Sequence, residues 1–495
     1  MDQSTTPLVD ALKHCANRPN AAFHTPGHKR GQGITHRHRD LFGNAVFRAD
    51  LPELPDLDNL FAPEGVILQA QQLAAAAFGA KQTWFLTNGS TCGIEAAILA
   101  TCGPGDKIIV SRNAHSSVIS GLILSGAVPI YVSPPYSREW NMPTGIIEPI
   151  SIAHQLQAHP DTQAVLIVSP TYEGLSSYVG TIAELAHRNN IPLIVDEAHA
   201  PHFAFHPGLP PSALAQGADI AIQSTHKVLS AFTQAAMMHV QGDRIDRQRL
   251  SQALQLTQST SPSYLLLGSL DAARHQMATH GNALLQKTFQ LAKRASLALQ
   301  KLPGIRVLRP SLERPDFHGD CTRLTINVAK LDLTGFEADD ILHTQHGVTA
   351  ELPTLHNLTF IISIGNTARD IERLIHAVTT LCQAYQPLAK ATSFSFYSDA
   401  MCQLLHQALS NQSESCLSPR QAFFAPKVSL PLQQAMGQIC GETICPYPPG
   451  IPVLRPGERI TAGAIAYLQA TLTAGGIITG CSDPKLKTIL VVEAC

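Results

Sequence analysis

The sequence predicts an α/β protein with a sheet domain of seven mostly parallel strands, followed by a small α+β domain and a C-terminal α+β domain. Two observations predict this fold class. Short runs that are apolar throughout alternate with stretches of helical periodicity, which is typical of parallel strands covered by helices on both faces. The chain also has 495 residues, which is too long for a single ordinary core, so we expect two or three domains.

The expected elements follow in chain order. A turn-rich arm comes first, and the large domain begins with the helical pattern "EGVILQAQQLAAAAFGA", which ends at a glycine. The predicted strands lie at 83–87, 107–111, 128–133, 164–169, 192–198, 219–224 and 236–240. The predicted domains are an N-terminal arm (1–60), a large domain (61–300), a small α+β domain (301–385), a linker (386–399) and a C-terminal domain (400–495).

Composition and charge exclude several kinds of partner. Lys and Arg total 35 against 37 Asp and Glu, for a formal net charge of -2. Neither sign forms a long run, so the basic patch of a nucleic-acid binder is missing. No apolar stretch approaches the roughly 18 residues of a membrane-spanning helix, and the first residues do not resemble a secretory signal. The 11 cysteines are odd in number and include no C-x-x-C pair, which is typical of reduced thiols, so we expect a cytoplasmic protein.

Polar residues gather where the predicted strands end, and ligands of open parallel sheets bind at that edge. The turn "TNGSTCG" after 83–87 exposes N–H groups and hydroxyls at a helix N-terminus, which suits a phosphate, although the same residues are ordinary helix caps. Asp196 follows the apolar residues "PLIV", and a buried carboxylate needs a partner. Lys227 follows another apolar strand, and lysine is rarely buried unless it is paired.

These residues together predict a site for pyridoxal 5'-phosphate (PLP). Asp196 and Lys227 are 31 residues apart, about one strand–helix–strand unit, so we expect them at nearby strand ends. PLP enzymes use a lysine that binds the cofactor aldehyde and an acid that pairs with the pyridinium nitrogen. Ser224 and His226 flank Lys227 and could reach the phosphate, and His115 could lie flat on the cofactor ring.

Two alternatives stay open on the residues alone. The segment "DEAHAPHFAFH" brings His199, His202 and His206 close together in the sequence, and such a cluster could bind the metal ion of a hydrolase. That alternative explains neither Lys227 nor the phosphate turn. The other alternative is a different PLP reaction, such as that of an aminotransferase, because residue types do not show which bond at the substrate Cα is cleaved.

A series of motifs along nearly the whole chain resembles the Orn/Lys/Arg decarboxylase family. In order they are "HTPGHKRG", "DLPELPDLDNLFAPEG", "TNGSTCG", "RNAHSSV", "VDEAHAPHF", "STHKVLSAFTQAA", "TSPSYLLLGSLDAAR", "SPRQAFFAP" and "YPPGIPVLRPGE". The resemblance implies a PLP-dependent, aminotransferase-like (fold type I) enzyme that releases CO2 from a basic L-amino acid. It favours arginine to agmatine over lysine to cadaverine and ornithine to putrescine, because the chain is similar to the short, biosynthetic branch that serves polyamine synthesis.

The resemblance also implies roles for the cofactor residues. Lys227 would carry the cofactor, Asp196 would pair with the ring nitrogen and His115 would stack on the ring. The residues implied to hold the phosphate are Ser90, Thr91, Ser224 and His226.

Further roles carried over by resemblance concern the substrate and the assembly. His199 would lie near the phenolic oxygen of the cofactor or the substrate carboxylate, and Lys227 or His199 would return a proton to the substrate carbon. Thr260 would contribute to the neighbouring subunit's phosphate site, so the smallest expected unit is a homodimer with shared active sites. Glu442 is the expected partner for the distal cation of the substrate.

The chain departs from the family pattern in two places. Many relatives have lysine directly after the ring histidine, whereas this chain has Ser116; we expect an electrostatic adjustment and retained activity. The sequence starts directly in the arm, so we expect it to lack the N-terminal receiver-like domain of the larger acid-inducible relatives and the high-order assemblies of those proteins.

Overall fold

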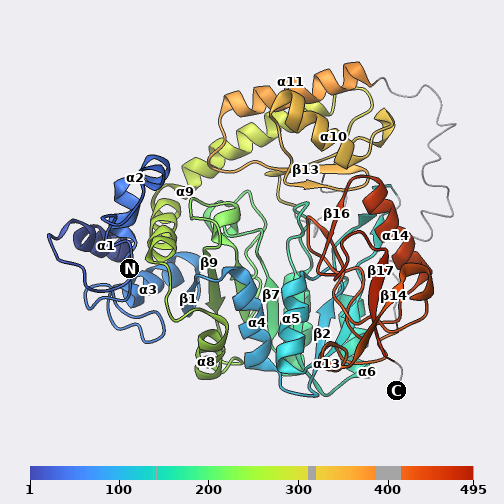
Figure 1. Ribbon diagram of the computed structural model, residues 1–495, viewed down its shortest axis with the longest axis horizontal. Coiled ribbons are helices and arrows are strands. Elements are labelled where there is room, and N and C mark those ends of the chain that lie inside the picture. Colours follow the sequence, from blue (N-terminus) through green and yellow to red (C-terminus); the bar gives the residue numbers. More distant parts are fainter. Residues whose placement is uncertain (138, 141, 310–318, 386–413, 494–495) are drawn as a thin grey trace. The chain divides into compact units, whose positions relative to one another are not determined.

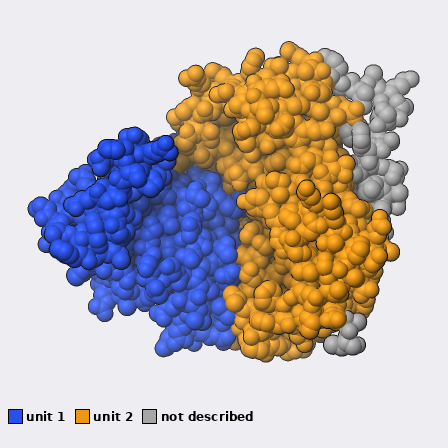
Figure 2. Space-filling view, viewed as in Figure 1, with its two compact units in different colours: residues 1–101, 194–285 blue, residues 102–193, 286–495 orange. Residues whose placement is uncertain are grey.

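The computed structural model describes residues 1–137, 139–140, 142–309, 319–385 and 414–493 (Figure 1). The chain divides into two compact units: unit 1 contains residues 1–101 and 194–285, and unit 2 contains residues 102–193 and 286–495 (Figure 2). The predicted large domain (61–300) is therefore divided between the two units. The predicted linker at 386–399 lies outside the described residues.

A seven-stranded, mostly parallel sheet confirms the predicted fold class. Its strand order is β1-β9-β8-β7-β6-β2-β3. The strands are β1 (Gln82–Leu86), β2 (Lys107–Ser111), β3 (Val128–Val132), β6 (Thr162–Val168), β7 (Leu193–Asp196), β8 (Ile220–Gln223) and β9 (Ala236–Val240). Strand β2 pairs in parallel with β3 and with β6, β7 pairs in parallel with β8, and β9 is antiparallel to β1 and β8. Every residue of β7, β8 and β9 is buried, which explains why these strands are apolar almost throughout rather than alternating.

Helices lie between most of these strands as the periodicity predicts, whereas only short turns lie between β7, β8 and β9. The helices are α1 (Pro7–Asn17), α2 (His36–Ala49), α3 (Val66–Phe78), α4 (Gly89–Thr101), α5 (Ser116–Ser125), α6 (Pro149–Ala158), α7 (Val179–Arg188), α8 (Arg247–Thr257), α9 (Tyr264–Leu299), α10 (Gly335–Ile341), α11 (Ala368–Ala384), α13 (Pro419–Phe424) and α14 (Ala462–Thr473). Short helical turns are η1 (Phe203–Phe205), η2 (Thr225–Lys227), η3 (Ala329–Leu331), η4 (Leu342–His346) and η5 (Leu432–Gln434). Helix α3 ends as expected at Gly79, whose φ of 73° is left-handed and favours glycine.

Unit 2 also contains smaller sheets in the regions predicted as α+β. A four-stranded sheet has the order β10-β11-β13-β12, and two-stranded sheets pair β14 with β17, β15 with β16 and β4 with β5. These strands are β4 (Tyr136–Ser137), β5 (Met142–Pro143), β10 (Arg306–Val307), β11 (Arg323–Asn327), β12 (Leu352–Pro353), β13 (Asn357–Ile361), β14 (Lys427–Pro431), β15 (Cys445–Tyr447), β16 (Ile477–Thr479) and β17 (Thr488–Val492). Helices α10 and α11 share an apolar core with β11 and β13, and α14 shares another with β16 and β17.

Two sequence expectations concern what the chain lacks. In the part of the chain that the structure describes, no helix combines the length and the apolar character needed to cross a bilayer. The nine cysteines among the described residues are all free.

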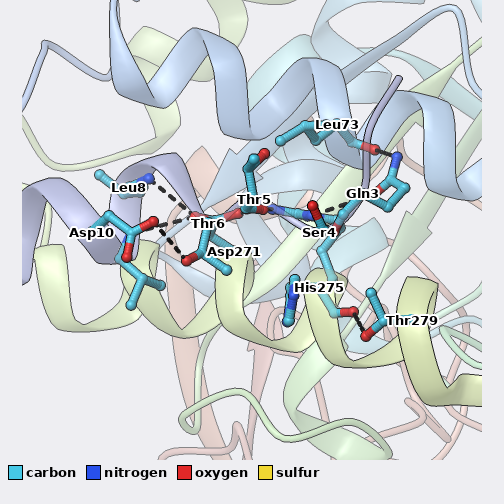
Figure 3. A network of polar contacts seen from close by, with 12 residues as sticks. Gln3, Ser4, Thr5, Thr6, Leu8, Asp10, Leu73, Asp271, His275 and Thr279 are labelled. Atoms are coloured by element: carbon cyan, nitrogen blue, oxygen red, sulfur yellow. Dashed lines mark hydrogen bonds and ion pairs between the residues drawn. The ribbon is translucent and has the colours of Figure 1, made fainter.

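The predicted arm contains two helices, α1 and α2, and the buried Asp271 on α9 anchors the first of them in unit 1 (Figure 3). Helix α1 has no capping side chain of its own. Asp271 on α9 instead accepts hydrogen bonds from the N–H groups of Leu8 (3.0 Å) and Val9 (3.3 Å). Arg274 pairs with Asp271, and both side chains are fully buried. A residue 263 positions away thus caps this helix, which local sequence patterns cannot reveal.

Replacing Asp271 with asparagine is expected to destabilise the protein by about 3–5 kcal/mol, because Arg274 would stay buried without its counter-charge. Urea denaturation would measure the change. The matched control is Asp56→Asn, which breaks the exposed Arg18–Asp56 pair and should cost less than about 1 kcal/mol. Equal effects of the two substitutions would contradict the anchoring role of Asp271.

Candidate functional site

Lys227 lies directly after strand β8, in the turn η2, and faces a histidine. Its Nζ donates a hydrogen bond to Nε2 of His199 over 2.9 Å. Asp196 is the last residue of β7 and lies opposite Ile222 of β8 in a parallel pair. The ends of these two neighbouring strands therefore hold both Lys227 and Asp196, as the 31-residue spacing predicts. Asp196 is only 6% exposed and accepts a hydrogen bond from the N–H of Ala198.

The predicted phosphate residues come from two elements of unit 1. Ser224 follows β8, Ser90 lies in the first turn of α4, and their hydroxyl oxygens are 2.8 Å apart. Thr91 is next to Ser90 and is exposed. The hydroxyl of Thr225 is buried and has no hydrogen-bond partner. His226 is different, because its Nδ1 donates to the backbone oxygen of Ala235 over 3.0 Å and only its other nitrogen can serve a ligand.

A PLP phosphate fits this arrangement of residues. Helix α4 begins at Gly89, whose φ of 76° turns the chain from strand β1 into the helix. The helix is 13 residues long, so its free N–H groups and dipole attract an anion, and the hydroxyls of Ser90, Ser224 and Thr225 can donate to it. The orphaned hydroxyl of Thr225 is the observation that points to a missing acceptor. Sequence analysis missed this residue because threonine has no distinctive pattern there.

A buried chain of hydrogen bonds runs beneath the ends of β7 and β8. Glu197 accepts hydrogen bonds from the N–H of Ala213 (2.7 Å) and from Nε2 of Gln223 (2.8 Å). The amide oxygen of Gln223 accepts from Nε2 of His239, and Nδ1 of His239 accepts from the hydroxyl of Thr83. Asp196 precedes Glu197, and Ser224 follows Gln223. These hydrogen bonds therefore fix the backbone beside two predicted cofactor residues. The sequence signal that could have revealed these hydrogen bonds is a polar residue within an otherwise apolar strand, such as Gln223 in β8 and His239 in β9.

Burial shifts the pKa values of Glu197 and His239, the two titratable groups in this series of hydrogen bonds, in opposite directions. Desolvation raises the pKa of Glu197 from 4.5 to about 7 and lowers the pKa of His239 from 6.5 to about 3. Between pH 4.5 and 6.5 the folded protein holds a proton on Glu197 that the unfolded chain releases. In the same range the unfolded chain holds a proton on His239 that the folded protein excludes. Acidification therefore stabilises the fold through Glu197 and destabilises it through His239.

Substitutions should separate these two opposing contributions. Relative to the unaltered protein, the free energy of unfolding of His239→Gln is expected to rise as the pH falls from 6.5 to 4.5. That of Glu197→Gln is expected to fall over the same range. Each slope should reach at most about 1.4 kcal/mol per pH unit. Urea denaturation at several pH values measures both slopes, and slopes of the same sign would contradict these opposite shifts.

The remaining predicted residues lie elsewhere. His115 in unit 2 caps helix α5, where its Nδ1 accepts from the N–H of Ser117 over 3.2 Å. A Cβ added at Gly450 would be 3.1 Å from Nε2 of His115, so the segment around Gly450 closely approaches the ring. Thr260 is exposed, between helices α8 and α9, which leaves it accessible to a second subunit.

Glu442 has a structural task in the C-terminal region. It is 8% exposed. Its two carboxylate oxygens accept hydrogen bonds from the N–H groups of Ser482 and Leu490, both over 2.8 Å. Its role at the distal cation of the substrate therefore stays a prediction with a competing explanation.

The metal alternative finds no support in the described part of the chain. No group of three or more His, Cys, Asp or Glu residues there is placed to hold a metal ion. His199, His202 and His206 are thus near one another in sequence without forming such a group.

Comparisons with known proteins identify the family. Residues 6–315 match the model of the Orn/Lys/Arg decarboxylase major domain, and residues 402–480 match that of the C-terminal domain. The chain is 37% identical to an arginine decarboxylase of Bacillus subtilis (strain 168), over 100% of this chain and 99% of that protein. Its fold is similar to lysine decarboxylase A from Pseudomonas aeruginosa, with a TM-score of 0.83 and 24% identity over 98% of this chain and 80% of that one. A pyridoxamine-pyruvate aminotransferase from Mesorhizobium loti shares the fold over 66% of this chain and 86% of its own, with a TM-score of 0.50 and 16% identity.

The matched domains cover most of the chain in the order that the motifs predict, and the likeness to the aminotransferase confirms the aminotransferase-like fold. The chain belongs to the Orn/Lys/Arg decarboxylase family.

Proposed function

We propose that this protein is a PLP-dependent decarboxylase that converts a basic L-amino acid, arginine above lysine and ornithine, to the corresponding amine and CO2. The observation that carries the proposal is the meeting of Lys227 with His199 at the end of β8, beside Asp196 at the end of β7. The preference for arginine is supported by relatives that are named arginine decarboxylase and are 35–37% identical to this chain.

The cofactor residues in this proposal are those carried over from the family. When bound, PLP offers an aldehyde for the substrate amine and a ring that accepts the electrons left as CO2 departs. Asp196, buried and acidic, would keep the ring nitrogen protonated, and His115 would fix the plane of the ring. The hydroxyl of Ser90 at the start of α4 and those of Ser224 and Thr225 after β8 would bind the phosphate.

Lys227 and His199 would handle the proton that replaces the lost carboxylate. Their nitrogens are 2.9 Å apart, which is within the distance needed for direct proton transfer. Either group could therefore deliver a proton to Cα and be reprotonated by the other, and solvent would restore the one proton that each turnover consumes. His199 is 3% exposed, so little water would compete at this position.

Product analysis tests the proposal. The purified protein with added PLP is given L-arginine, L-lysine and L-ornithine in equal competition, and the amines are separated by chromatography. Agmatine as the dominant product is expected, and cadaverine or putrescine would change only the substrate. Absence of any amine from a protein that retains PLP would reject decarboxylation and favour another PLP reaction, such as transamination.

We further propose a cytoplasmic homodimer that acts in polyamine synthesis, with Thr260 completing the partner's phosphate site. Helix α2 supports the dimer, because none of its 14 residues is buried in the single chain. Leu41 and Phe42 on this helix are 74% and 53% exposed, and Phe23 in the preceding segment is 95% exposed. Large apolar side chains this exposed in a single chain are expected where another chain covers them.

The double substitution Leu41→Asp and Phe42→Asp is expected to convert the dimer to monomers and to reduce turnover at least about tenfold, since burying carboxylates in an interface is costly. Light scattering after size exclusion measures the mass. Ile150→Asp alters a side chain that is 66% exposed on α6 and serves as the control. A double variant that remains dimeric and active would show that α2 is not the interface.

A further inference from the structure

A cavity in unit 2 has the composition of a pocket for an alkyl cation. Its volume is about 150 Å³, which is sufficient for a group the size of benzene. Its wall is mainly apolar, with contributions from Met142, Leu352, Leu355 and Val453. The tyrosines at 136, 172 and 467 also line it, and aromatic rings of this kind attract cations.

One carboxylate, that of Glu173, lines this cavity without a cationic partner. Glu173 is half-buried and accepts a hydrogen bond from the Thr171 hydroxyl. Among the described residues no lysine or arginine forms an ion pair with it, and burial raises the pKa of its carboxyl group. A cation that entered the cavity would reverse this unfavourable burial.

The two arginines that line the same cavity already share a different carboxylate. Arg112 donates two hydrogen bonds to Glu458, of 2.7 and 3.1 Å, and Arg455 lies 3.5 Å from the same carboxylate. Both guanidinium groups also face the ring of Tyr131, at 5.5 and 5.0 Å from its centroid. These contacts hold the arginines in place and leave Glu173 as the available anion of the cavity.

Glu173 and the predicted ring residue His115 both belong to unit 2 and follow the carboxyl ends of two paired strands. Glu173 follows the carboxyl end of β6, the edge where parallel sheets bind ligands. Strand β6 pairs in parallel with β2, and the segment after β2 contains His115. The cavity wall includes Pro449 and Ile451, and Gly450 between them is the residue that approaches the His115 ring. The wall segment around Gly450 thus lies next to His115, the predicted support of the cofactor ring.

We infer that this cavity receives the distal, positively charged end of the substrate and that Glu173 is the residue that binds it. The inference rests on the proposed function and names a residue of the same site. It assigns to Glu173 the role that sequence resemblance gave to Glu442, whose oxygens are occupied by two backbone N–H groups. A guanidinium group can donate two parallel hydrogen bonds to one carboxylate, so arginine suits this partner best.

Steady-state kinetics of the PLP-loaded Glu173→Gln variant test the inference. We expect KM for L-arginine to rise at least about thirty-fold, as for loss of a buried charge partner, with PLP absorbance unchanged. The preference for arginine over its uncharged analogue L-citrulline should fall by a similar factor. Glu173→Asp keeps the charge and should retain part of that preference. A KM increase in Glu442→Gln and none in Glu173→Gln would overturn the inference.

A binding measurement separates this inference from the proposed reaction. Calorimetry compares n-propylguanidine with uncharged n-propylurea on the PLP-loaded protein, and neither compound can react. Preference for the cation that disappears in Glu173→Gln supports the pocket even if no amino acid is decarboxylated. Equal binding of both compounds to the unaltered protein, together with normal arginine turnover, would reject the pocket and leave the proposed function intact.

Discussion

Replacing Lys227 with alanine is expected to abolish turnover, lowering kcat by more than about a thousandfold. The variant loses both the amine that would carry the cofactor and the proton donor that lies 2.9 Å from His199. Amine formation in the presence of excess PLP measures the loss.

Two control variants make the Lys227 result specific. Lys227→Arg keeps a positive charge but offers no primary amine, so it should be as inactive as the alanine variant. Lys81→Ala removes a lysine whose side chain is 46% exposed and pairs with Asp243 at the surface, and its kcat should be unchanged. Turnover of Lys227→Ala within tenfold of the unaltered protein would remove Lys227 from the mechanism.

Replacing Asp196 with asparagine is expected to leave PLP bound and to reduce kcat at least about a hundredfold. Asparagine has nearly the same shape, but it cannot hold a proton on the ring nitrogen by charge, and an unprotonated ring accepts electrons less readily. Absorbance of the bound cofactor and amine formation, measured on the same sample, separate binding from chemistry.

Asp219 offers a matched control for this experiment. It is buried like Asp196, but it immediately precedes β8, at the opposite edge of the sheet, where it pairs with Arg244 over 3.2 Å. Asp219→Asn should reduce stability while the folded enzyme keeps its kcat within about threefold, as expected of a substitution away from the site. If both variants lost activity equally, the loss in Asp196→Asn would be explained by removal of a buried charge and not by a lost interaction with the cofactor nitrogen.

Much of the fold could be predicted because its strands are buried on both faces. Strands such as β7 and β8 are read directly from apolar runs bounded by polar residues, and the strand-end rule then selects Asp196 and Lys227. The pairing of Asp196 with Ile222 shows that β7 and β8 are neighbouring strands, as the spacing predicts, although only the short turn η1 and no α-helix lies between them.

The residues that sequence analysis missed depend on contacts between distant segments. Asp271 caps α1 across 263 residues, and His239 reaches Thr83 across 156. Glu173 has no motif of its own, and its importance arises because the cavity forms where parts of unit 2 that are far apart in the sequence meet. Residue types and local periodicity do not show which distant segments are in contact, so the roles of Asp271, His239 and Glu173 could be identified only from the structure.

Peptide mapping of the cofactor link tests the central claim most directly. The PLP-loaded protein is treated with borohydride, which makes the bond between cofactor and lysine permanent, then digested and analysed by mass spectrometry. The account predicts that the added mass of the reduced cofactor is found on the peptide containing Lys227. A modified lysine elsewhere, or no modified peptide from a protein that retains PLP absorbance, would contradict the assignment of the site and of the reaction built on it.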